Sequence, residues 1–217
     1  MPYLLFASLA CLAFAPPLDI LRLDSPPRAS GIPAGWQIRE VRGQRPPGAT
    51  VRVADGQAAF AIFGAGRAGW FYREFEEPLP ESGRMLEWTW RVLAGPSQAD
   101  LRDRKLDDSP IRVFVVFGKP GGLFGGSGRV IFYTHGNDEP AGFARPSHAS
   151  SRMHVVRADG AASRPGWQDH AVEPFADYRR IWNRNPPAIT AIGVMHDTDQ
   201  TRGHAEAEIR RLVWRAP

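Results

Sequence analysis

The chain has 217 residues, a length that suits one large domain or two small ones. Its 43% hydrophobic and 23% charged residues are ordinary for a globular protein, while 22 glycines and 20 prolines exceed their usual combined share of about 12%. This composition predicts many turns and few long helices, and it excludes a coiled coil, a collagen, a helical bundle and a disordered chain. The net charge of +4 comes with acids interspersed among the bases, so no basic stripe predicts nucleic-acid binding.

The start of the chain has the composition of a signal peptide. Residues 1–15 carry no charge and include an apolar run, residues 4–14, followed by a small-x-small sequence that ends at Ala15. We therefore expect residues 1–15 to be a signal peptide and the protein to be periplasmic or secreted. The alternative is a buried first strand of a cytoplasmic protein, because no Lys or Arg precedes the run and Pro16 would follow the cleavage site.

The only cysteine, Cys11, lies within this apolar start. Removal of the segment would leave a chain without disulfides, without a cysteine nucleophile and without cysteine-bound zinc. The apolar run is too short to cross a bilayer comfortably, and no other stretch is long and apolar enough, so we expect no transmembrane span.

Turn residues divide the rest of the chain into short β-type segments. Residues 16–35 are rich in Pro and Gly and are expected to be a leader into one domain, residues 36–217. Ten strands are predicted, at residues 50–54, 57–63, 69–75, 85–93, 111–117, 129–134, 153–158, 167–172, 189–196 and 205–214. Asp55-Gly56 indicates a hairpin between the first two. The spacing of Phe175, Tyr178 and Trp182 predicts a single short helix near residues 174–183.

The faces of two predicted strands indicate the architecture. Trp88 and Trp90 share an apolar face of residues 85–93, and the residues between them predict a solvated opposite face. Residues 111–117 are apolar on both faces, which predicts a central strand covered on both sides. Many antiparallel strands of uneven length favour an all-β, antiparallel β-sandwich of jelly-roll type over a barrel.

Acidic residues gather at the start of one predicted strand and at the end of another. They are Asp100, Asp107 and Asp108 before residues 111–117, and Asp197 and Asp199 after residues 189–196. If these strands are antiparallel neighbours, the carboxylates meet at one rim of the sandwich. Three interpretations remain open: a network of ion pairs and turn caps with cations such as Arg112, a Ca²⁺ site made of oxygen ligands, or a catalytic site.

Aromatic residues near strand ends are the second group of candidates. Trp70, Tyr72 and Trp167 have rings that can stack on a sugar, and Arg73 and Arg91 can donate hydrogen bonds to hydroxyl or carboxylate groups. The alternative is that all of them are packing residues, because aromatic side chains dominate protein cores.

Several segments together resemble a known family. They are Leu86-Glu87-Trp88-Thr89-Trp90-Arg91-Val92, Ala99-Asp100, Asp107-Asp108, residues 111–117 and Asp197-Thr198-Asp199-Gln200-Thr201-Arg202-Gly203. Over residues 36–215 the chain resembles DUF3047, a bacterial family of unknown function, although Gln200 stands where asparagine is usual. The resemblance implies export and an all-β fold, and it supplies no reaction.

Two functions from different classes follow from these features. The first is a non-catalytic module that binds glycan or another component of the cell envelope. The alternative is a polysaccharide-acting enzyme, a hydrolase or lyase, that uses the acidic rim. Carboxylates about 5–10 Å apart in an open groove would favour the enzyme, whereas carboxylates buried against arginine would favour the module.

Overall fold

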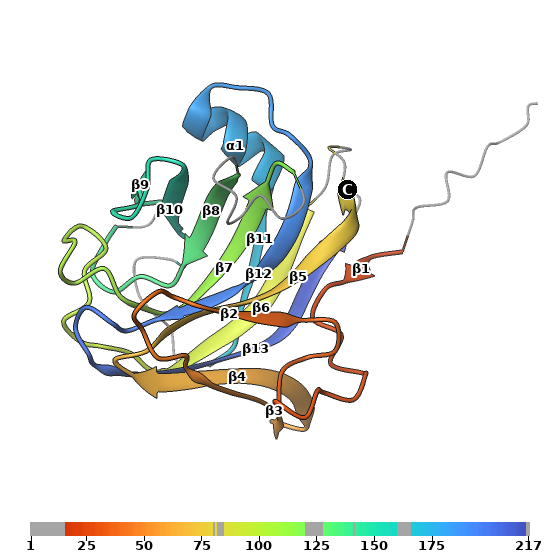
Figure 1. The fold of residues 1–217 in the computed structure, drawn as a ribbon, viewed down its shortest axis with the longest axis vertical. Helices are drawn as coiled ribbons and strands as arrows, with labels where there is room; N and C mark the ends of the chain where they lie inside the picture. Colours follow the sequence, from red (N-terminus) through yellow and green to blue (C-terminus); the bar gives the residue numbers. More distant parts are fainter. Residues whose placement is uncertain are drawn as a thin grey trace, which may run out of the picture.

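Two β-sheets and one helix, α1 (Pro174–Trp182), form the protein (Figure 1). The computed structural model describes residues 16–79, 81, 85–119, 128–140, 142–159 and 166–215. The expected signal peptide, residues 1–15, lies outside them.

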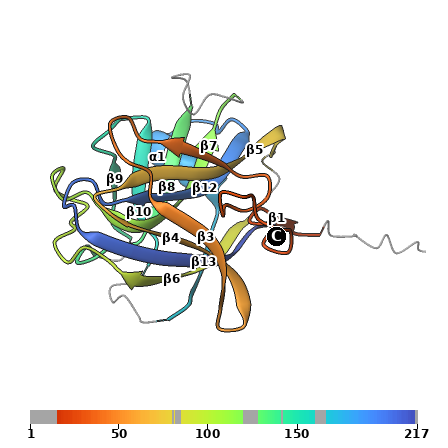
Figure 2. The same ribbon diagram turned by 60° about the horizontal axis from the view of Figure 1, so that its bottom comes forward.

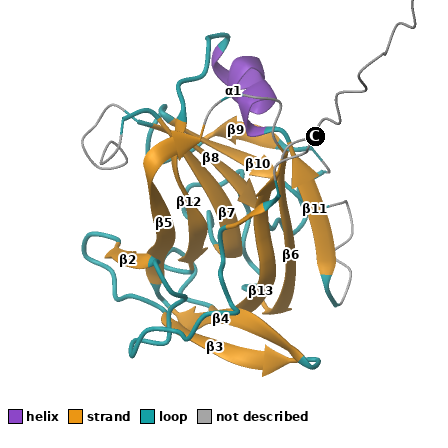
Figure 3. Cartoon of the chain, turned by 90° about the vertical axis from the view of Figure 1, so that its right-hand side faces the viewer, coloured by secondary structure: helices purple, strands orange, loops and turns teal. Residues whose placement is uncertain are grey.

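The two sheets pack face to face as a sandwich (Figure 2, Figure 3). The six-stranded sheet runs in the order β11 (Gln168–Val172), β6 (Met85–Ala94), β13 (His204–Arg215), β4 (Gln57–Ala65) and β3 (Gly48–Ala54), with β1 (Leu18–Asp19) paired to β13. The seven-stranded sheet runs in the order β2 (Gln37–Glu40), β5 (Ala68–Leu79), β12 (Ile189–Asp197), β7 (Ser109–Phe117), β8 (Arg129–Thr134), β10 (Met153–Arg157) and β9 (Ala144–Pro146). Strands β8 and β10 are parallel, and the other described pairs are antiparallel. The predicted all-β, jelly-roll-like sandwich is confirmed.

The ten predicted strands are all present, and the helix ends one residue before its predicted end. Asp55 and Gly56 join β3 to β4, and both have positive φ (50° and 76°), as a tight hairpin turn of type I′ requires. The sequence did not predict β1, β2 and β9. These strands have two to four residues, too few to show an alternating pattern.

Part of the expected leader, residues 16–35, packs on the sandwich. Leu18 pairs with Trp214 of β13, and the two residues that follow β1, Ile20 and Leu21, are buried. The indole Nε1 of buried Trp36 donates a hydrogen bond of 2.8 Å to the carbonyl of Ile20. These contacts close one end of the core.

Strand β7 is the central strand that its sequence predicted. All nine of its residues are buried, and the same is true of its neighbour β12. Val113 and Val115 face the core between the sheets, whereas Phe114 and Val116 belong to a second apolar cluster on the outer face of the seven-stranded sheet. The strands that lead to the acidic rim are therefore held on both sides.

The outward face of β6 differs from the sequence prediction. Trp88 and Trp90 are fully buried, as expected, but Glu87 and Thr89 on the opposite face are only 8% and 3% exposed. Glu87 forms ion pairs with two arginines of β13, and Thr89 Oγ1 donates a 2.5 Å hydrogen bond to Asp169 of β11. Because long polar side chains of both flanking strands fold over it, the face that we expected to be solvated is covered.

Helix α1 packs where β7 ends. The rings of Phe175 and Tyr178 lie 5.8 and 4.8 Å from that of Phe117, measured between centroids. This end of β7 is opposite to the one that follows Asp107 and Asp108, so the helix and the acidic rim lie at different ends of the sandwich. Among the described residues, we find no helix with the length and apolar character that a membrane crossing needs.

Replacing Trp88 or Trp90 with Ala should lower the free energy of unfolding by about 3–5 kcal/mol, because each change leaves a large cavity between the sheets. Leu93→Ala on the same strand is the control, since Leu93 is 48% exposed and its loss should cost less than about 1 kcal/mol. Urea denaturation measures all three. A tryptophan variant as stable as the control would contradict the packing described here.

Candidate functional site

The acidic residues that precede β7 and follow β12 meet at one rim. The two strands are antiparallel neighbours, and Asp197 pairs in register with Ser109. One carboxylate oxygen from each of Asp108, Asp197 and Asp199 lies within 4.8 Å of the others. The structure thus has the juxtaposition that strand order predicted. Asp100 lies apart in the preceding loop, where it forms an ion pair of 2.7 Å with Arg102.

Asp108 anchors the turn that follows β12. Its Oδ1 accepts a hydrogen bond from the backbone N–H of Gln200 (3.1 Å), and its Oδ2 accepts bonds from the backbone N–H (2.7 Å) and Oγ1 (2.5 Å) of Thr201. The carboxylate is almost fully buried. Both oxygens are therefore occupied by the turn, which leaves this residue poorly placed to bind an ion.

A buried guanidinium neutralises the adjacent part of the rim. Arg112 is 3% exposed, and its Nη2 donates hydrogen bonds to Asp107 Oδ1 (2.9 Å) and to the Asp107 carbonyl (2.8 Å). The same nitrogen lies 3.5 Å from Asp197 Oδ2. A buried charge needs such partners, because its desolvation is otherwise not offset. This geometry favours the interpretation of the rim as ion pairs and turn caps.

Two carboxyl groups of the rim have pKa values above the usual range for aspartate. Burial raises the pKa of Asp197 well above its usual value, in spite of the opposing charge of Arg112. Burial also raises the pKa of Asp199, and the nearby negative charge of Asp108 raises it further. The negative charges of Asp199 and Asp108 also raise the pKa of Asp197, because neighbouring carboxylates disfavour its ionised form.

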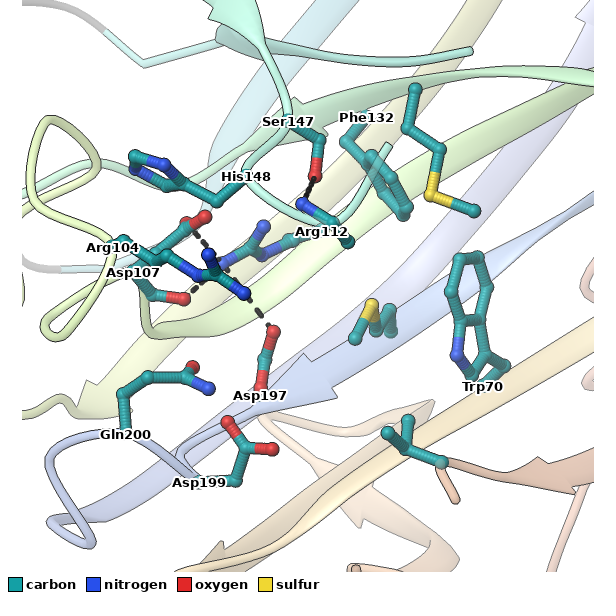
Figure 4. A pocket seen from close by; sticks show the side chains of 14 residues that line it. Trp70, Arg104, Asp107, Arg112, Phe132, Ser147, His148, Asp197, Asp199 and Gln200 are labelled. Carbon is teal, nitrogen blue, oxygen red and sulfur yellow. Dashed lines mark hydrogen bonds and ion pairs between the residues drawn. The ribbon is translucent and has the colours of Figure 1, made fainter. Parts of the chain in front are cut away.

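A pocket of about 270 Å³ opens beside these groups on the outer face of the seven-stranded sheet (Figure 4). We call it the rim pocket. Its apolar lining consists of Val41, Trp70, Phe132, Ala149, Met153 and Met195. Its polar lining consists of Arg104, Asp107, Arg112, Ser147, His148, Asp197, Asp199 and Gln200. Figure 4 shows the charged groups together at one side and Trp70 at the other.

Two of the predicted ligand-binding residues lie on the face that carries this pocket. Trp70 lines it while packing edge-on against Phe114, with ring centroids 4.9 Å apart. Tyr72 lies two residues along β5 in the same apolar cluster and hydrogen-bonds to Gln37 through its hydroxyl (3.4 Å). Arg73 belongs to the other face of β5, and its guanidinium donates to the carbonyl of Asp19 (3.1 Å).

The other two predicted residues lie on the six-stranded sheet and near its edge. The guanidinium carbons of Arg91 and Arg210 lie 4.6 and 4.5 Å from the centroid of the Trp167 ring. The indole Nε1 of Trp167 donates a 2.8 Å hydrogen bond to Asp55. Two arginines therefore contact the Trp167 ring, which remains partly exposed.

Sequence reasoning did not single out several residues that line the rim pocket. Phe132 is in β8 and Met195 in β12, where each reads as an ordinary core residue. Arg104 and His148 come from two loops that the sequence did not place beside each other. The alternation along β8 could have put Phe132 on the same face as Val130, but no local signal joins the two loops.

Comparison with known families identifies the chain's relatives. The profile of a family described as "Protein of unknown function (DUF3047)" matches residues 34–213. The chain belongs to this family. No curated protein matches it.

The chain is similar to several solved structures. A family 11 carbohydrate-binding module of a cellulosomal cellulase of Clostridium thermocellum is 8% identical with a TM-score of 0.51, over 93% of this chain and 95% of that one. The xyloglucanase domain of a type three effector from Sinorhizobium fredii is 8% identical (TM-score 0.48; 84% and 94% covered). A family 11 xylanase from Neocallimastix patriciarum is 9% identical (TM-score 0.47; 84% and 91% covered). The first of these establishes a shared fold and nothing finer, and the other two add no argument to it.

Arg112→Ala should lower the free energy of unfolding by about 3–5 kcal/mol, because it leaves buried carboxylates without their counter-charge. Arg104→Ala, which removes an exposed arginine of the same pocket, is the control and should change stability little. A chelator should leave the melting temperature of the wild-type protein unchanged. A melting temperature that falls with chelator and recovers with added calcium would instead establish the Ca²⁺ interpretation.

Proposed function

We propose that this DUF3047 protein is an exported module that binds glycan in the rim pocket without cleaving it. The observation that carries the proposal is the lining of the pocket, in which Trp70 and Phe132 face a cluster of hydrogen-bonding and charged groups. Sugars present apolar C–H faces and a periphery of hydroxyl groups, so this combination suits both parts of a sugar ring. The fold shared with a carbohydrate-binding module supports the proposal at the level of architecture.

The polar side of the rim pocket keeps free hydrogen-bonding capacity. Among the described residues, Arg112 Nε and Asp199 Oδ1 have no hydrogen-bond partner although both atoms are shielded from solvent. A hydroxyl group can accept from the first and donate to the second. The exposed Gln200 side chain adds an amide that can do both. A sugar could therefore pair with Gln200 in this structure, whereas Arg112 Nε and Asp199 Oδ1 would first have to be uncovered.

The spacing of the carboxyl groups favours binding over hydrolysis. One carboxylate oxygen of Asp197 lies within 4.8 Å of one of Asp199, which is less than the roughly 5 Å that separates the two carboxyl groups of retaining glycosidases. Asp107 and Asp108 are buried and engaged with Arg112 and the turn. The specific observation for the enzyme alternative is the raised pKa of Asp197, because a general acid needs such a shift.

Binding to an array of oligosaccharides, with and without chelator, tests the function. Trp70→Ala should weaken binding by about tenfold or more, because the aromatic wall is lost. Gln200→Ala changes only an exposed side chain and should also weaken binding, so it covers the case in which Trp70→Ala unfolds. Trp167→Ala, on the other sheet, is the matched control and should bind normally.

Two results would contradict the proposal. If no glycan binds, or if Trp167→Ala loses as much affinity as Trp70→Ala, the rim pocket is not a glycan site. If bound polysaccharide is cleaved, with new reducing or unsaturated ends that disappear in Asp197→Asn, the enzyme alternative replaces the module.

Export is the remaining part of the proposal, and it depends on the uncharged, apolar start of the chain. N-terminal sequencing of the protein from its native host should show the loss of about fifteen residues. Recovery of intact Met1 from the cytoplasmic fraction would move the function inside the cell.

A further inference from the structure

A second hollow, of about 420 Å³, lies next to the rim pocket. It is lined by Gly43, Gln44, Arg45, Ala65, Gly66, Arg67, Asp199 and Arg202. We call it the arginine hollow after its three arginines. Asp199 lines both cavities, so the two are contiguous.

Backbone contacts bring the three arginines together from distant parts of the sequence. Arg45 and Arg67 form an isolated parallel bridge. The backbone N–H of Arg67 donates to Thr198 Oγ1 (3.0 Å), and its carbonyl accepts from the N–H of Thr198 (2.8 Å). The turn that carries Arg202 is held by Asp108, as described above. The convergence is therefore built by the main chain.

The floor of the hollow brings the turn residues close. Gly66 has φ +58°, a conformation that side chains rarely adopt, and a Cβ placed there would lie 3.7 Å from Arg202 Cβ. The turn containing Gly66 therefore lies directly against Arg202.

The positive charge of the hollow is largely uncompensated. Among the described residues, the exposed side chains of Arg45 and Arg202 have no hydrogen bond or ion pair, and the Arg67 guanidinium donates only to the carbonyl of Pro46 (3.3 Å). Asp199 is the one acidic residue that lines the hollow, and among the described residues no ion pair joins it to the three arginines.

Two arginines of the six-stranded sheet behave differently. On the six-stranded sheet, Arg52 and Arg91 each lie 2.5 Å from a different oxygen of buried Glu208. The contrast shows that the fold pairs arginine with acid where the charge is structural. Guanidinium groups that converge without acids are suited to carboxylate, sulfate or phosphate, which they bind with charge-assisted and often bidentate hydrogen bonds.

We infer that the arginine hollow is an anion subsite of the glycan site, and this inference rests on the proposed function. It receives a negatively charged substituent, a carboxylate or a sulfate ester, of a glycan whose neighbouring sugar occupies the rim pocket. The substrate class is therefore an acidic polysaccharide.

The test compares three probes by calorimetry: a neutral cello-oligosaccharide, an oligogalacturonate and a sulfated galactan oligosaccharide of similar length. An acidic probe should bind the wild-type protein more tightly than the neutral one, and the better of the two acidic probes identifies the substituent. Arg45→Ala combined with Arg202→Ala should weaken binding of that probe by about tenfold, because two charge-assisted contacts are lost. Its binding of the neutral probe should not change.

A charge-matched variant separates a site from general attraction. Arg28→Ala combined with Arg42→Ala removes two exposed arginines that do not line either cavity, so acidic probes should still bind at wild-type strength. Equal losses in the two double variants would show screening by overall charge and would overturn the inference.

The remaining outcomes distinguish the two proposals. If the neutral probe binds as tightly as the acidic ones, the anion subsite is wrong and the glycan module stands. If no oligosaccharide binds, both fail. If single-stranded DNA competes for Arg45 and Arg202 as strongly as the acidic glycan does, the subsite is not one for glycan.

Discussion

The burial of Arg112 beside the acidic rim is the interaction on which the functional end of the molecule depends. Four carboxylates, those of Asp107, Asp108, Asp197 and Asp199, are brought together by the pairing of two strands whose residues are all buried. Unopposed, they would repel one another strongly at such short range. The Arg112 guanidinium and the backbone N–H groups of the turn after β12 offset part of that negative charge. The pKa of Asp197 is raised as well. The carboxyl groups of the rim therefore differ in the partners that neutralise them.

This arrangement gives the two sheets different surfaces. On the six-stranded sheet, Arg52 and Arg91 form ion pairs with Glu208, and Arg91 and Arg210 contact the Trp167 ring. The arginine hollow lies among the loops that connect the two sheets, where Arg45 and Arg202 have no ion pair among the described residues. Beside the rim pocket, Arg112 Nε and Asp199 Oδ1 have no hydrogen-bond partner in the described part of the chain. The rim pocket and the arginine hollow share Asp199, so both lie beside the acidic rim.

The sequence predicted the architecture because the fold rests on local patterns: alternation around Trp88 and Trp90, a hairpin at Asp55-Gly56, and a strand apolar on both faces. It predicted the rim on the condition that residues 111–117 and 189–196 are antiparallel neighbours, as β7 and β12 are in the structure. It could not predict which loops meet across a sheet. The aspartates and Arg112 of the rim pocket were therefore identified from the sequence, but Arg104 and His148 were not. Trp167 illustrates the limit, because its ring is covered by Arg210, forty-three residues away in the sequence.

The anchoring of the turn after β12 has a consequence for how this protein can change. Asp108 holds that turn mainly by backbone N–H groups, and the one side chain it grips is that of Thr201. Gln200 and Arg202 lie on either side of Thr201 and have exposed side chains. Gln200 lines the rim pocket, and Arg202 lines the arginine hollow. Substitutions at Gln200 and Arg202 can therefore change the ligand preference of the proposed site without changing the fold. The turn is thus a suitable place to engineer specificity.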